Sequence, residues 1–264
     1  DTDRPEAGAP TFGAASRRKQ ARELTMASLD IIGAITMTAA AAVLVGTIAA
    51  AYPGPLPARL RLIAAFALWF TLVVLASGRG LLDPVTGFGV PALGFAIVVP
   101  IVVMAFVATS SGERLQRVLA IPMPALILTH VLRILAVQFL LLWSAGRLTA
   151  PFAPLAGWGD IITGVTAVPV AWAVWRKAAG WRPLAVIWNL FGAADLIDAI
   201  SLGVLSAPGS PLQLFAIPSE PVMTTLPWVL IPGYLVPLLF MTHVLMLAQL
   251  GAHAPAVDLR AQRL

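Results

Sequence analysis

Strongly polar side chains interrupt three long apolar stretches of the sequence. A charged residue inside a membrane span costs about 2.5–3.5 kcal/mol on insertion scales, so each one requires a partner or a role. The residues that share this setting are His130, Arg133, Asn189, Asp195, Asp198 and His243. We therefore expect these side chains to line one pocket inside the membrane that binds a small ligand or cofactor.

The depths of these residues along their apolar stretches support a shared pocket. His130 and Asn189 each lie six residues from the start of their stretches, and His243 lies seven residues from the end of its own. In an up-and-down bundle with a rise of about 1.5 Å per residue, all three lie about 9–10 Å below the same membrane face. Arg133 lies about 4–5 Å deeper, and Asp195 is deeper by about as much again.

These depths also predict an ion pair within the bundle. An unpaired arginine is costly in lipid, so we expect a carboxylate to neutralise Arg133, with Asp195 as the first partner and Asp198 as the second. Asp160 is expected at the opposite membrane face. There it opens a helix and has the favourable position of a negative charge at a helix N-terminus.

Two histidines at matched depth on different helices suggest a cofactor site. His130 and His243 have the ring nitrogens to ligate haem b axially, or to join Asp195 or Asp198 around a divalent metal ion. The alternative is that each histidine forms hydrogen bonds between helices and stabilises the bundle without binding a metal.

The same polar residues are compatible with two other classes of function. Buried chains of histidine, arginine and aspartate are typical of pathways for protons, ions or small solutes, which predicts a transporter. A small membrane protein without a soluble domain also fits a non-catalytic structural subunit of a larger membrane complex, with the polar groups serving helix packing. No sequence motif identifies a catalytic set, so enzymatic activity is left open.

Residue usage excludes several cofactors and partners. The chain contains no cysteine, which excludes covalent haem attachment and iron–sulfur clusters. Its lysines are Lys19 and Lys177, both outside the apolar stretches, so no buried amine is present to form a Schiff base with retinal. Basic residues lie mostly at the ends of apolar stretches without a basic stripe, so we expect no nucleic-acid partner.

Composition places the whole chain in the membrane. Of its 264 residues, 59% are hydrophobic and 11% are charged, whereas soluble domains carry about 25% charged residues. Seven apolar stretches, each near the 20 or so residues needed to cross a bilayer, span residues 30–52, 60–77, 89–108, 124–145, 159–176, 183–206 and 227–250. Continuous apolar runs require helices, because lipid offers no partner for backbone polar groups. The sequence predicts an all-α, polytopic bundle of seven transmembrane helices.

The domain organisation and location follow from this pattern. We expect residues 1–29 to form a polar tail that is disordered or interfacial, residues 30–250 to form the membrane domain, and residues 251–264 to form a short polar tail. Membrane lipid is the expected partner, together with further membrane subunits if the protein belongs to a complex. The arginine- and alanine-rich composition suggests a bacterial cytoplasmic membrane.

Basic residues near the ends of the stretches favour one orientation. Nine lie on the side of the C-terminus and six on the side of the N-terminus, so the positive-inside rule favours an outside N-terminus and an inside C-terminus. The nine are Arg59, Arg61, Arg114, Arg117, Arg176, Lys177, Arg182, Arg260 and Arg263, and the six are Arg17, Arg18, Lys19, Arg22, Arg79 and Arg147.

Overall fold

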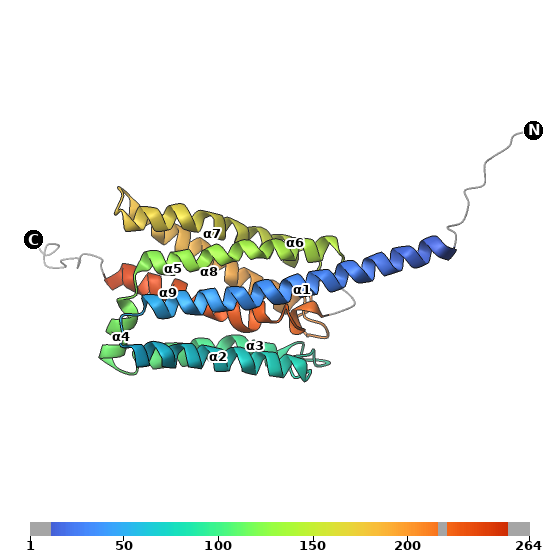
Figure 1. Cartoon of the computed structure of the whole chain (residues 1–264), viewed down its shortest axis with the longest axis horizontal. Coiled ribbons are helices and arrows are strands. Elements are labelled where there is room, and N and C mark those ends of the chain that lie inside the picture. Colours follow the sequence, from blue (N-terminus) through green and yellow to red (C-terminus); the bar gives the residue numbers. More distant parts are fainter. Residues whose placement is uncertain (1–11, 216–220, 253–264) are drawn as a thin grey trace, which may run out of the picture.

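The protein is an all-α membrane bundle. A computed structural model describes residues 12–215 and 221–252, and within these residues seven helical spans are long and apolar enough to cross a membrane (Figure 1). The expected class and number of spans are therefore confirmed. The first 11 and last 12 residues of the expected tails lie outside the described residues.

The helices alternate in direction along the chain. The first three spans are α1 (Phe12–Ala51), α2 (Leu56–Gly78) and α3 (Pro91–Thr109), and the short helix α4 (Gly112–Leu119) follows them. The fourth span is continuous and consists of α5 (Met123–Thr129), η1 (His130–Ala136) and α6 (Val137–Ser144). The fifth and sixth spans are α7 (Phe152–Trp175) and α8 (Trp181–Leu205), and after the short η2 (Val222–Thr224) the last span consists of η3 (Ile231–Leu235) and α9 (Val236–Ala252).

Two helices begin seven or more residues before the apolar stretches predict. Helix α1 already begins at Phe12, so part of the expected polar tail of residues 1–29 is helical. Helix α7 begins at Phe152, seven residues before the expected start at residue 159. Pro154 lies in the first turn of α7, where a helix does not need the missing backbone N–H. The earlier start places Asp160 within the helix.

Helix α7 packs extensively against its neighbours in the chain and lies along an outer edge of the bundle (Figure 1). It packs against α5, η1 and α6 along one face and against α8 along another, and α8 in turn packs against α9. Helices α2 and α3 lie along one edge of the bundle, and the first part of α1 extends beyond the ends of its neighbours (Figure 1). Helix α3 packs against η3 and α9, so both α3 and α8 border the last span.

Two spans depart from α-helical geometry at mid-length or at one end. The segment η1 is a 3₁₀ helix inside the fourth span, and η3 is a π-helical segment that contains Pro232. Two hydrogen bonds join η3 to α2: Trp69 Nε1 of α2 donates to the Gly233 carbonyl at 3.1 Å, and the Tyr234 hydroxyl of η3 donates to the Phe66 carbonyl at 3.2 Å. Irregular turns of this kind inside helices often occur at functional sites.

Candidate functional site

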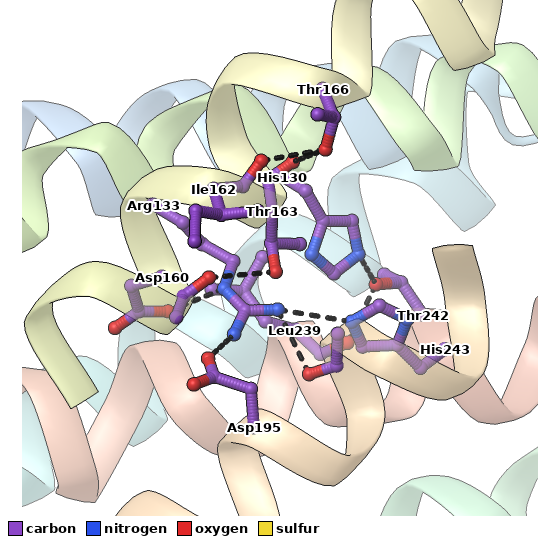
Figure 2. A network of polar contacts seen from close by, with 12 residues as sticks. His130, Arg133, Asp160, Ile162, Thr163, Thr166, Asp195, Leu239, Thr242 and His243 are labelled. Carbon is purple, nitrogen blue, oxygen red and sulfur yellow. Dashed lines mark hydrogen bonds and ion pairs between the residues drawn. The ribbon is translucent and has the colours of Figure 1, made fainter. Parts of the chain in front are cut away.

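A buried guanidinium joins four structural elements at the middle of the bundle. Arg133, on η1, donates through Nε to Asp160 Oδ1 on α7 and through Nη2 to Asp195 Oδ2 on α8. Its Nη1 donates to the Gly192 carbonyl at 3.0 Å and lies 3.2 Å from His243 Nε2 on α9. Figure 2 shows the guanidinium between these partners. Its side chain is 1% exposed, so protein groups take the place of water around the charge.

The expected pair of Arg133 with Asp195 is present, but the second carboxylate differs from the expected one. Asp160 takes this place, because the early start of α7 puts it in the third helical turn instead of at the membrane face. Asp198 is exposed on α8. Residues three apart on a helix point in directions that differ by about 60°. This difference directs Asp198 away from Arg133, the partner of Asp195.

The hydrogen bonds fix the proton of His243. Arg133 Nη1 can only donate, so His243 Nε2 accepts from it. The opposite ring nitrogen, Nδ1, lies 2.6 Å from Asn189 Oδ1, while Asn189 Nδ2 donates to the His243 carbonyl at 3.0 Å. The amide oxygen can only accept, so His243 carries its proton on Nδ1 and is neutral.

The same reasoning leaves one nitrogen of His130 without a partner. The Thr242 hydroxyl donates to the Leu239 carbonyl at 2.7 Å, so it accepts from His130 Nε2 at 2.8 Å. The other nitrogen, Nδ1, is buried and has no hydrogen bond. The imidazole lies edge-on to Trp188, with ring centres 5.3 Å apart. Depth matching thus correctly places His130, Asn189 and His243 together, and Thr242 joins them.

This arrangement does not fit the expected haem or metal. The centres of the His130 and His243 rings are 4.1 Å apart. When two imidazoles ligate one iron from opposite sides, the two ligating nitrogens are already about 4 Å apart. The centres of the two rings are then further apart than this distance. Both ring nitrogens of His243 are already hydrogen-bonded. Within the described residues, no group of three or more His, Cys, Asp or Glu side chains is placed to hold a metal ion.

Three glycines allow the helices to approach closely enough to form the network. A Cβ at Gly192 would lie 2.7 Å from His243 Cε1, and a Cβ at Gly164 would lie 2.8 Å from the Ile134 backbone nitrogen. A Cβ at Gly159 would overlap the Asp195 carboxylate. The sequence offers no direct signal for these roles, because small residues are common throughout membrane helices.

An apolar cavity of about 340 Å³ reaches the network from one end of the bundle. Its walls include Leu93 and Ile97 of α3, and Ala199 and Gly203 of α8. Asp160 is the ionisable side chain among the described residues that line it. It lies eight residues into α7, so it is about 12 Å below the end at which the cavity opens. The Asp160 side chain retains 13% exposure, whereas Arg133 behind it is sealed.

A comparison with known families covers this region. The family model described as "Domain of unknown function (DUF8737)" matches residues 90–251, which is more than half of the chain. The match includes the whole Arg133 network and the cavity walls named above. No curated protein and no solved structure matches the chain.

Proposed function

Because the chain belongs to the DUF8737 family, whose description names no activity, we propose a function from the site itself: the protein binds a small amphipathic molecule that enters the cavity from the lipid bilayer. The observation that carries this proposal is that an apolar cavity of about 340 Å³ ends on a carboxylate held in place by a buried arginine. Apolar walls with a few fixed polar groups are the usual composition of small-molecule sites.

The position of the cavity supports entry from lipid. Val98 of α3 and Val204 of α8 line it and are 55% and 40% exposed. Both helices belong to membrane spans, so an opening between them faces hydrocarbon. A molecule with an apolar body can therefore reach the cavity without crossing water.

The network also differs from one that only fastens helices together. A closed, dry network satisfies all of its polar groups, since an unpaired buried group costs stability. Here Asp160 keeps part of its surface towards the cavity, so the network is not closed on that side. Rigid groups with unused hydrogen-bonding capacity are suited to hold the polar part of a ligand.

Transport of the bound molecule is the second candidate function. Its support is that the 3₁₀ segment η1 contains Arg133, while the π-helical segment η3 lies in the last span beside the cavity. Irregular helical segments absorb backbone changes more readily than α-helix does. Uptake into vesicles that contain the purified protein would distinguish transport from binding alone.

Filling the cavity is expected to abolish binding. Ala199→Trp places an indole in the cavity wall of α8 and should remove small molecules that co-purify with the protein, measured by native mass spectrometry from mild detergent. The control is Ala194→Trp, which adds the same side chain at an exposed position on the same helix and should leave the bound mass unchanged. Equal bound mass in Ala199→Trp and the wild type would contradict the proposal.

We further propose a bacterial cytoplasmic membrane with the C-terminus inside. Basic residues support this orientation at the end of the bundle formed by the α1–α2, α3–α5 and α7–α8 connections: Arg59, Arg61, Arg114, Arg117, Arg176 and Lys177. The cavity opens at the opposite end, beside the connection between α6 and α7. In this orientation it receives molecules from the outer half of the bilayer.

A further inference from the structure

We infer that the cavity selects molecules whose polar group is a cation, such as the ammonium group of a lipophilic amine. This inference rests on the proposed function and specifies the chemical class of the ligand. Three observations carry it: the charge of the network, the position of Asp160 on the cavity wall, and the surroundings of the cavity.

The network has one more carboxylate than it has cations. Arg133 is shared by Asp160 and Asp195, and the hydrogen bonds of His243 make that residue neutral. The formal charge of these groups is therefore −1 when both carboxyl groups are ionised. Low-dielectric surroundings strengthen charge interactions and make an uncompensated charge costly. A cation beside the network removes this cost.

The free capacity of the network is directed at the cavity. Asp160 uses Oδ1 for Arg133 and lines the cavity, whereas Arg133 lies behind it with 1% of its side chain exposed. A ligand in the cavity therefore meets a carboxylate before it meets the guanidinium. When both carboxyl groups are ionised, an anionic group at this position is repelled, and a hydroxyl group leaves the negative charge uncompensated.

The described surroundings add no competing positive charge. Arg147, in the connection beside the cavity mouth, is paired with Asp30 of α1 at 2.6 Å. Asp30 also accepts from Trp228 Nε1 at 2.7 Å, which holds this pair at the start of the last span. The polar residues of the cavity wall besides Asp160 are the uncharged Thr149, Ser206 and Thr224. Amphipathic cations thus match both the walls and the charge of the cavity.

The test compares three probes with ten carbon atoms each: decylamine, decanol and decanoate. Each is added to the full chain in nanodiscs of zwitterionic lipid, and thermal unfolding is followed by tryptophan fluorescence. Ligand binding to the folded state raises the midpoint temperature of unfolding, so saturating decylamine should raise this temperature by about 5 °C. Decanol should need at least about 10-fold higher concentration for the same shift, and decanoate should have no effect. Ala199→Trp corrects for effects of the probes on the lipid.

Two variants assign the preference to one carboxylate. Asp160→Asn should make decylamine and decanol equally effective, whereas Asp198→Asn, which removes an exposed carboxylate from the neighbouring helix, should keep the preference for decylamine. If Asp160→Asn does not fold, the three probes on the wild type and on Ala199→Trp still decide the question.

The same measurements distinguish failure of the cation preference from failure of the proposed function. Shifts that are equal for all three probes in the wild type and are lost in Ala199→Trp would overturn the preference for cations while leaving the cavity as a binding site. Shifts that are absent in the wild type, or that persist unchanged in Ala199→Trp, would overturn the proposed function as well.

Discussion

Replacing Arg133 with methionine is expected to lower the free energy of unfolding by about 3–5 kcal/mol, because it leaves two buried carboxylates without their shared cation. The substitution also removes the donor that the Gly192 carbonyl and His243 Nε2 share. The change can be measured by SDS-induced unfolding in mixed micelles, and it should be large enough to reduce the yield of folded protein.

Two matched variants separate this effect from a general cost of losing an arginine. Arg79→Met removes an exposed arginine at the end of α2 and should change stability by less than about 0.5 kcal/mol. The triple variant Arg133→Met, Asp160→Asn and Asp195→Asn should recover at least about half of the loss, since removing a whole buried ion network is often nearly neutral. A single Arg133→Met variant as stable as the wild type would show that the network contributes nothing to folding.

Gly159→Ala is expected to destabilise the protein by about 3 kcal/mol, despite adding only a methyl group. The new Cβ would overlap the Asp195 carboxylate, which cannot move away without losing its bond to Arg133. Overpacking of a buried contact costs about 1–3 kcal/mol, and here the loss of an ion pair adds to it. The midpoint of thermal unfolding in detergent measures the effect.

The control for this substitution is Gly46→Ala in α1. Apart from the adjacent residues and the nearby backbone of the same helix, no atom lies within 4 Å of a Cβ at Gly46, so the added methyl group causes no clash. Alanine favours helix by up to about 1 kcal/mol over glycine, so this variant should be equal to the wild type or slightly more stable. Similar unfolding midpoints for the two variants would argue against close packing of Asp195 on α7.

Hydropathy predicts the seven spans because a long apolar run in lipid must form a helix, which satisfies its own backbone hydrogen bonds. Counting residues from the ends of the spans also places His130, Asn189 and His243 at one level, since helical rise is constant. The same count identifies the bond between Arg133 and Asp195. These successes all depend on position along a helix, which the sequence contains directly.

Asp160 shows where such reasoning is insufficient. The role of Asp160 depends on where α7 begins. The residues between Phe152 and Gly157 are apolar, but their sequence resembles a loop because Pro151 precedes them and Pro154 lies among them. A span from residue 159 to 176 would contain only 18 residues, whereas Phe152–Trp175 contains 24. That shortness is a usable signal for an earlier start. The 3₁₀ turn at Arg133 and the cavity result from contacts between helices, which local sequence does not determine.

The most direct test of the cavity as a binding site is an experimental density map of the full chain in nanodiscs, obtained by cryo-electron microscopy with a bound antibody fragment. We expect non-protein density between α3 and α8 that contacts Asp160 in the wild type and is absent in Ala199→Trp. A cavity closed by its own side chains in the wild type, or density that stops at the mouth without reaching Asp160, would contradict a ligand site at the Arg133 network.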